Sequence, residues 1–360
     1  MAVYRINPEK DTTIWSEPTL AGLYGNAGKD EIVELGGYPD LNLVGRTKRI
    51  LTQYSIADIQ STINTKVTGD FSASLHMYLA NASEIPTSFT IYSYFISQSW
   101  SNGTGKLDDI PVNRTGTTWK YRDAQNNLWD TLGGDYITEK SGSLSGSLLN
   151  ISSSQTFGIY SDHDINLNVT DQVKLFYSES VTNYGLLLKL DDTFENNTTQ
   201  SLSLKYFSVD SNTIFPPYLE FKWDDSSYSS SLTELATDIA TISIKNAREK
   251  YIDSDVVRFR ISARPKYPAR SFTTSSIYLT EYKLPQTSYW GIKDEFSNEM
   301  IIDFDDEYTK ISADNTSSYF DVYMNSLQPN RYYRVLVKSV LNQSTVILDN
   351  KNVFKVVKNG

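Results

Sequence analysis

The residues best suited to metal or acid chemistry lie in "WSNGTGKLDD", residues 100–109, where Trp100 precedes two glycines, an asparagine and the adjacent carboxylates Asp108 and Asp109. Calcium needs six to eight oxygen ligands, and the acidic spacing of a calcium-binding EF-hand loop is absent here. Neighbouring side chains of an extended segment point to opposite sides, so these two carboxylates do not easily hold one ion. The stretch therefore favours a turn, with a calcium site as the alternative, and we expect Trp100 and Trp119 to pack on one core wall.

Glycoside hydrolysis is the acid chemistry to consider next, because it needs two carboxylates on either side of a sugar cleft. The chain offers many carboxylates outside obvious charge runs, and nothing in their spacing singles out a pair. We therefore predict a non-enzymatic protein with no catalytic residues, and keep a hydrolase as an alternative. The carboxylates considered are Glu17, Glu84, Asp135, Asp162 and Asp164.

Metal binding is limited by the composition, because the chain has no cysteine and only two histidines, His76 and His163. A zinc site built from several histidines or thiolates is thereby excluded. We interpret "SDHDIN" (161–166) as a solvated loop, His76 as a half-buried, hydrogen-bonded histidine, and "DFDDEYTK" (303–310) as a solvated turn. A weak cation site is the alternative for both acidic segments, and no cofactor is predicted.

Protein–protein contact is the most plausible chemistry of "RPKYPARSF" (264–272), a basic, proline-stiffened segment in an acidic chain. Prolines favour an extended segment, and arginine is enriched at interfaces. We predict an interface carried by Arg264, Lys266, Tyr267 and Arg270. The alternative is a loop whose arginine stems cover a sheet edge.

Aromatic residues suggest a second binding mode, since exposed rings stack on pyranose faces. The candidate platforms are "YSYF" (92–95) and "TSYWGIKD" (287–294), and a core position is the preferred interpretation of each.

The composition restricts the class of protein. The 360 residues carry a net charge of -10 and 39% apolar residues, with 25 Tyr and 15 Phe. Such an acidic chain is a poor ligand for polyphosphates, so we expect no nucleic-acid partner. No run of about 18 apolar residues and no amino-terminal signal pattern is present, so we expect no membrane partner and no passage through a secretory route. The sequons at 102 and 150 are then unglycosylated.

The elements that must position these residues are mostly strands, because alternating apolar residues recur between turn-rich segments. In 88–100, Phe89, Ile91 and Phe95 share one face, and Tyr92 and Tyr94 share the other. A helical turn or a short helix is expected in "SIADIQSTINT" (55–65), with Ser55 or Asp58 near its start, and another after a strand that starts at 165. Further strands are expected at 49–56, 72–82, 183–191, 200–210 and 216–225.

A Ser-rich polar segment divides the chain into two expected domains, 1–224 and 238–360, joined by a linker at 225–237. The second domain has alternating strands and the size of an immunoglobulin-like sandwich. There Leu327 would plug the core, and Tyr332 or Tyr333 would act as the corner tyrosine.

The order of segments in 11–224 resembles the DNRLRE family of β-sandwich domains. The resemblance rests on "DTTIW" (11–15), "NAGKDEIVELGG" (26–37), "RILTQYSI" (49–56), "SWSNGTG" (99–105) with "TTW" (117–119), "NVTDQV" (168–173), "NYGLLLK" (183–189) and "PPYLEF" (216–221). Phe176 stands where that family usually has Trp. The resemblance implies a DNRLRE-like, jelly-roll-type β-sandwich for the first domain. With the immunoglobulin-like sandwich expected from the strand pattern of 238–360, the predicted fold class is all-β, with two β-sandwich domains.

The C-terminal part resembles virion structural proteins of tailed, T4-like marine phages. The segments that carry this are 264–312, 317–335 and 352–357. The resemblance implies a virion protein of the tail, neck, baseplate or fibre region, which assembles with other virion proteins and forms a homo-oligomer in the particle. The alternative is a carbohydrate-binding or host-attachment module on a fibre, with a host glycan as ligand.

Overall fold

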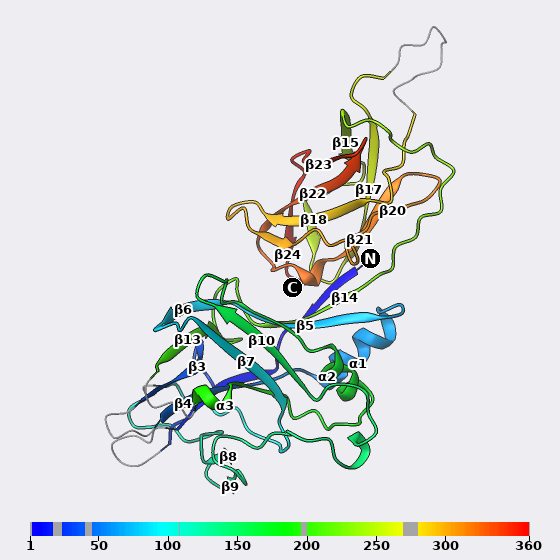
Figure 1. The fold of residues 1–360 in the computed structure, drawn as a ribbon. Helices are drawn as coiled ribbons and strands as arrows, with labels where there is room; N and C mark the ends of the chain where they lie inside the picture. Colours follow the sequence, from blue (N-terminus) through cyan, green and yellow to red (C-terminus); the bar gives the residue numbers. More distant parts are fainter. Residues whose placement is uncertain are drawn as a thin grey trace. The chain divides into compact units, whose positions relative to one another are not determined.

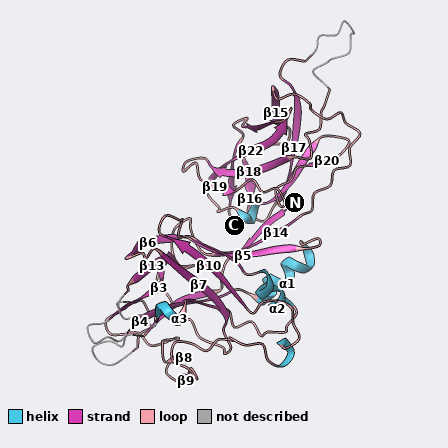
Figure 2. Cartoon of the chain, in the orientation of Figure 1, coloured by secondary structure: helices cyan, strands magenta, loops and turns pink. Residues whose placement is uncertain are grey.

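The computed structural model describes residues 2–16, 24–39, 45–107, 109–195, 200–268 and 280–359. The fold is an all-β sandwich fold, as predicted, and its few helices are short (Figures 1 and 2). The chain forms two compact units. The larger unit comprises 6–66 and 72–220, and the smaller unit comprises 1–5, 67–71 and 221–360.

Two sheets and a ribbon contain the strands of the first 223 residues. An eight-stranded sheet has the order β10 (Ser152–Gly158), β7 (Ser88–Phe95), β12 (Leu186–Leu190), β4 (Gly45–Gln53), β3 (Ile32–Pro39), β13 (Leu202–Phe207), β6 (Leu79–Ser83), with β2 (Lys10–Trp15) paired to β4. A four-stranded sheet has the order β1 (Ala2–Ile6), β14 (Tyr218–Trp223), β5 (Phe71–Met77), β11 (Ile165–Asn168). The ribbon pairs β8 (Tyr121–Asp123) with β9 (Asn127–Leu128).

The helices of the larger unit begin where the sequence indicates. In α1 (Ile56–Thr65), the Ser55 side chain accepts a hydrogen bond from the Asp58 N–H, which is N-capping. In α2 (Thr170–Tyr177), Val173 and Phe176 are buried, and Phe176 packs edge-on against Phe95 of β7 at 4.9 Å. The remaining short helices are α3 (Asp192–Glu195) and the 3₁₀ turn η1 (Gly142–Leu144).

Two expected strands differ in detail from the prediction. The segment 72–82 is divided at Tyr78 into β5 and β6, which belong to different sheets. The segment 88–100 ends as a strand at Phe95, and its alternation is as predicted, with Phe89, Ile91 and Phe95 buried while Tyr92 and Tyr94 are half-buried.

The smaller unit packs two sheets around one core. The first has the order β15 (Ala240–Ile244), β17 (Val256–Pro265), β21 (Ser318–Tyr323), β20 (Ser312–Ala313). The second has the order β16 (Lys250–Ile252), β24 (Val353–Val357), β22 (Tyr332–Leu341), β18 (Ser288–Asp294), β19 (Met300–Ile302), with β23 (Ser344–Leu348) paired to β22 and the 3₁₀ turn η3 (Met324–Ser326) before β22.

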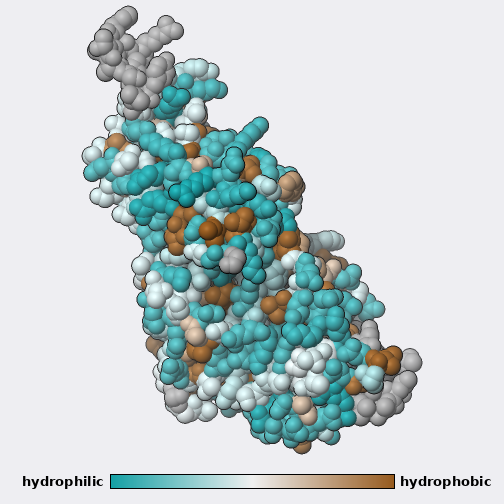
Figure 3. All heavy atoms as spheres, turned by 180° about the vertical axis from the view of Figure 1, so that it is seen from behind, coloured by the Kyte–Doolittle hydropathy of each residue, from teal (hydrophilic) through white to brown (hydrophobic). Residues whose placement is uncertain are grey.

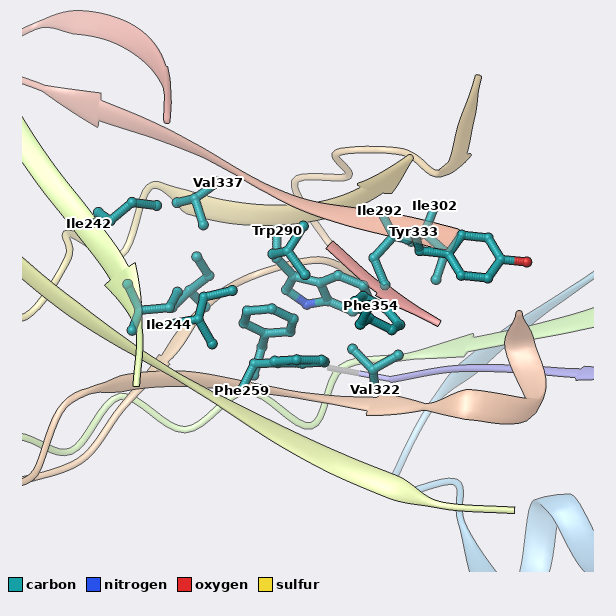
Figure 4. Packing of buried hydrophobic residues seen from close by; sticks show 14 of the residues in the cluster. Ile242, Ile244, Phe259, Trp290, Ile292, Ile302, Val322, Tyr333, Val337 and Phe354 are labelled. Carbon is teal, nitrogen blue, oxygen red and sulfur yellow. The ribbon is translucent and has the colours of Figure 1, made fainter. Parts of the chain in front are cut away.

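An aromatic stack fills the core of the smaller unit (Figure 4). The Trp290 ring lies 4.9 Å from that of Phe320, which in turn lies 5.4 Å from Phe259. Leu327 is buried in this core, as predicted. Of the two candidate corner tyrosines, Tyr333 is buried and its hydroxyl donates to the Gln328 carbonyl at 2.9 Å, the contact that defines a tyrosine corner.

The segment 225–237, expected as a linker, packs within the smaller unit. Tyr228 forms a β-bridge with Ala313, Glu234 forms one with Lys283, and Leu235 is buried in the core. Residues 1–5 and 67–71 also belong to this unit, although they precede the expected boundary. Serine-rich composition indicated a linker, but the backbone of this segment pairs with strands that come later in the sequence.

Candidate functional site

The predicted interface segment lies at a sheet edge of the smaller unit. Arg264 is opposite Thr241 of the edge strand β15, and the Lys266 N–H donates to the Ile239 carbonyl at 2.9 Å. Tyr267 is 75% exposed, and Ile239 beside it is 52% exposed. Arg264, Lys266 and Tyr267 are therefore brought together next to an edge strand. Arg270 lies outside the described residues.

The stretch 100–109 is an irregular connection held by a buried asparagine. Both Asn26 Nδ2 hydrogens are donated, to the carbonyls of Asn102 and Thr117 at 2.8 Å each. Asn26 Oδ1 accepts from the N–H groups of Gly28 and Gly105. All four hydrogen-bonding capacities of this amide are thus used, which fixes the backbone of the connection.

Glycines are required in this connection because the backbones approach closely. A Cβ on Gly28 would lie 1.9 Å from the Asn102 carbonyl oxygen, and Gly103 has a φ of +78°. Asp109 accepts a hydrogen bond from the Lys106 N–H at 2.8 Å, within the turn, and Asp108 lies outside the described residues. The geometry agrees with the predicted turn.

Trp100 and Trp119 belong to one hydrophobic cluster, as predicted, together with Trp129. Trp100 Nε1 donates to the Tyr184 carbonyl at 2.7 Å, and Lys10 Nζ lies 4.0 Å from the Trp100 ring centroid while donating to the Trp100 carbonyl. These contacts give the indole both a hydrogen-bond partner and a cation–π contact, which is a structural role.

The candidate acid-chemistry carboxylates are dispersed among local contacts. Asp135 accepts from the N–H groups of Asp130 and Thr131 at 2.7 and 2.6 Å, and Asp162 accepts from the Asp164 N–H at 3.1 Å. Burial raises the pKa of Asp164, whose carboxylate accepts from the Leu79 N–H at 2.6 Å.

Of the two remaining candidates, Glu84 is exposed on a turn with a φ of +58°, and Glu17 lies outside the described residues. Among the described candidates, Asp162 and Asp164 are neighbours that interact electrostatically, and both accept backbone hydrogen bonds.

Both histidines are packed against aromatic rings. His163 is buried, with its ring 5.8 Å from Phe89 and 5.9 Å from Phe157, so the solvated-loop interpretation holds for Asp162 but not for His163. His76 is half-buried and stacks on Tyr218 at 4.8 Å, with Nε2 3.5 Å from Glu220 Oε1. Stacking gives each imidazole an aromatic partner, whereas neither Nε2 has a hydrogen-bond partner among the described residues, so His76 is half-buried as predicted but its Nε2 is not hydrogen-bonded.

The acidic run 303–310 is a capped turn. Asp305 accepts from the N–H groups of Glu307 and Tyr308, both at 2.8 Å, and the Thr309 hydroxyl donates to the Asp305 carbonyl. Across the described ranges, no group of three or more His, Cys, Asp or Glu residues is placed to hold a metal ion.

A buried ion network on β4 and β12 was missed by the sequence reasoning. Arg49 makes a bidentate pair with Glu195, through Nε at 3.0 Å and Nη2 at 2.7 Å. Lys189 Nζ lies 3.2 Å from Glu195 Oε2, the oxygen that Arg49 Nη2 also contacts, and Lys189 pairs with Asp192 as well. Burial lowers the pKa of Lys189, but Glu195 and Asp192 outweigh burial and raise it overall. One feature of the sequence could have indicated this network: Lys189 is the single charged residue in the otherwise apolar strand "LLLKL" (186–190).

Asp11 is a second buried carboxylate, and nothing in the sequence pattern indicated that it would be buried. It is 1% exposed and accepts from the Ser208 hydroxyl and the Val209 N–H, both at 2.9 Å. Burial raises the pKa of Asp11 to about 6, although its two hydrogen bonds and the nearby Lys29 oppose the change. Opposite Asp11 in the ladder is Thr52, whose buried hydroxyl finds no hydrogen-bond partner among the described residues.

The two aromatic platforms differ in exposure. Tyr92 and Tyr94 stack at 6.0 Å on the outer face of β7, and Tyr136 packs on Tyr94 at 5.0 Å; all three are half-buried. In 287–294, Trp290 is fully buried, as the core interpretation predicted. Tyr289 in the same segment is half-buried, so each platform presents some ring surface, and three rings gather in the first.

No family model and no curated protein matches the chain. A solved structure of a DUF4785 family protein from Legionella pneumophila subsp. pneumophila str. Philadelphia 1 is similar at 12% identity. That similarity covers 98% of this chain and 66% of the other, with a TM-score of 0.18. A similarity this low carries no argument about function, and the resemblances to DNRLRE domains and phage proteins stay expectations. Among the described helices, none is long and apolar enough to cross a membrane.

Proposed function

We propose that this chain is a non-enzymatic structural component of a tailed-phage virion, in the tail, neck, baseplate or fibre region, and that it acts by protein–protein assembly. The proposal combines the sequence resemblance of 264–357 with one structural observation. The exposed Tyr267 follows the basic residues Arg264 and Lys266, and the exposed Ile239 accepts a backbone hydrogen bond from Lys266 beside the edge strand β15.

Such a surface suits assembly for physical reasons. Edge strands present unpaired backbone groups that a neighbouring protein can cover, and Tyr and Arg are enriched at the energetically important positions of interfaces. The buried charged groups support the same proposal, because Arg49, Lys189 and Glu195 neutralise one another inside the scaffold. They hold strands together instead of facing a substrate.

Incorporation into particles tests this function. A tagged chain expressed during infection is expected to co-purify with intact particles, and Arg264→Glu with Lys266→Glu is expected to lower its incorporation at least about tenfold, since like charges at an interface are repulsive. Lys120→Glu with Lys140→Glu, on the other unit, is the charge-matched control. Unchanged incorporation of the first variant would remove this interface.

A carbohydrate-binding or host-attachment module is the second candidate, favoured by the Tyr92, Tyr94 and Tyr136 platform. Beside it stand Lys189 and the exposed Asp192, and an aromatic face with a neighbouring carboxylate is suited to a sugar ring and its hydroxyls. A glycan array is the test. Strong binding that Tyr92→Ala abolishes, and that Tyr177→Ala retains, would promote this candidate over assembly.

A further inference from the structure

The outer face of the six-stranded sheet in the smaller unit gathers lysines and exposed aromatic rings. Register places them together: Lys355 is opposite both Lys250 and Tyr332, and Lys338 is opposite Tyr289. Positions along β22 alternate between this face and the buried Tyr333, Val335 and Val337. We call this surface the lysine face, and define it by Lys250, Lys293, Lys338, Lys355, Phe296 and Tyr332.

The lysines of this face are not neutralised. Within the part of the chain that the structure describes, no carboxylate lies within ion-pair distance of any of the four. Lys355 and Lys338 instead lie near aromatic rings, at 5.5 Å from Tyr332 and 5.8 Å from Tyr289. Arg334 on the same face differs, because Glu295 and Asp349 pair with it.

The same face exposes apolar surface. Phe296 is 75% exposed and packs edge-on against Tyr332, which is 40% exposed. Ile347 of β23, opposite Lys338, is 58% exposed. Figure 3 shows, for one side of the molecule, a mainly hydrophilic surface with scattered hydrophobic groups. Aromatic rings among unpaired cations form a surface for an acidic partner that also offers apolar contacts.

The chain itself supplies an acidic partner. The larger unit has 14 Lys and Arg against 24 Asp and Glu, whereas the smaller unit has 19 against 19, so the whole net charge of -10 belongs to the larger unit. We propose that the lysine face binds the acidic larger unit of a second copy, in a head-to-tail contact. This inference rests on the proposed assembly function and names its surface.

Head-to-tail contacts join two different surfaces, so they generate rings or filaments instead of closed pairs. A nucleic acid would also be attracted to lysines, but the acidic larger unit would repel it, so we favour the protein partner.

Sedimentation velocity of the purified chain tests the proposal. We expect concentration-dependent association at about 30 mM salt that weakens strongly at about 500 mM, because exposed charges are screened. Lys338→Glu with Lys355→Glu is expected to weaken association by roughly tenfold or more. Lys351→Glu with Lys358→Glu, exposed and of equal charge change, is expected to associate like the unchanged chain.

Three results would overturn the inference: a monomer at all concentrations and low salt, association that both double variants share equally, or binding of polyglutamate or DNA by a chain that stays monomeric. Thermal unfolding of each variant confirms that it is folded. Failure here leaves particle incorporation through 264–267 untouched, so the two proposals fail separately.

Discussion

The larger and the smaller unit use the same strand architecture but place charge differently. The larger unit carries the whole net charge and also buries ionised groups, including Lys189, Glu195 and Glu34. The smaller unit is neutral overall, and its core combines aromatic rings with aliphatic side chains in one hydrophobic cluster. The smaller unit also buries a carboxylate fully, that of Asp294, whose Oδ2 lies 2.7 Å from Arg331 Nε.

The two units differ in how far the charged side chains on a sheet face are buried. In the larger unit, β12 is buried along its whole length, because α3 brings Glu195 over the face on which Lys189 and Arg49 lie. A charged layer is therefore sealed between sheet and covering segment. On the outer sheet face of the smaller unit, by contrast, Lys250 is exposed and Lys293, Lys338 and Lys355 are half-buried, so the lysines stay at the surface.

The largest expected effect is on the aromatic core. Trp290→Ala removes a fully buried indole stacked on Phe320, and we expect it to lower the free energy of unfolding of the smaller unit by about 3–5 kcal/mol. Chemical denaturation followed by fluorescence measures this. The control is Tyr289→Ala, next to it on the outer face, with a loss below about 1 kcal/mol. Equal losses for both would contradict the assignment of the core.

The ion network of the larger unit gives the next effect. Glu195→Ala leaves Arg49 and Lys189 buried without their shared carboxylate, and the expected loss is about 3 kcal/mol. Urea unfolding, compared with the exposed Glu84→Ala, measures it. A loss as small as that of the control would mean that water or another acid solvates the two cations.

The pH dependence of stability should have opposite signs in the two units. Burial raises the pKa of Asp11 to about 6, above its unfolded value near 4, so its contribution to stability is full below about pH 4 and is lost as the pH rises through 6. The size of this loss is about 2–3 kcal/mol. Burial opposes ionisation of Asp294 as well, but Arg331 and two backbone N–H groups outweigh it and lower the pKa to about 2.

Asp294 therefore contributes stability above about pH 4 that is lost as the pH falls through 2. Unfolding measured with probes for each unit between pH 2 and 7 checks both signs. Asp11→Asn is expected to remove the slope between pH 4 and 6 only. A slope that persists in this variant would assign it to another group.

The smallest predicted effect belongs to the corner tyrosine. Tyr333→Phe keeps the buried ring but removes the hydrogen bond to the Gln328 carbonyl, and we expect a loss of about 1 kcal/mol in the smaller unit. Tyr332→Phe, at the exposed neighbouring position, is the control. If Tyr332→Phe cost more, the corner would be assigned to the wrong residue.

Local patterns predicted much of the fold. Local patterns located β7, β12 and β13, and of the two candidates Ser55 and Asp58 the structure shows Ser55 as the N-cap of α1, because period and capping are local properties of the sequence. The packing of 225–237 was not predictable, since its partners Lys283 and Ala313 lie about 50 and 85 residues away in the chain.

The site was predictable to a smaller extent. The segment at Arg264 stood out by composition, and the structure places it beside an edge strand. The network of Arg49, Lys189 and Glu195 did not stand out, because its members come from separate segments and only the fold brings them together. Nor could the alternation of apolar residues show that Asp11 is buried, with Ser208 and Val209 as its hydrogen-bond partners.

The measurement that tests the assembly role most directly is quantitative mass spectrometry of intact, gradient-purified particles of a phage that encodes this chain. An assembly component is expected at a fixed number of copies per particle, retained after high-salt washing at a constant ratio to the other virion proteins. Absence from the particles, or a ratio that falls towards zero with washing, would contradict the role in the virion.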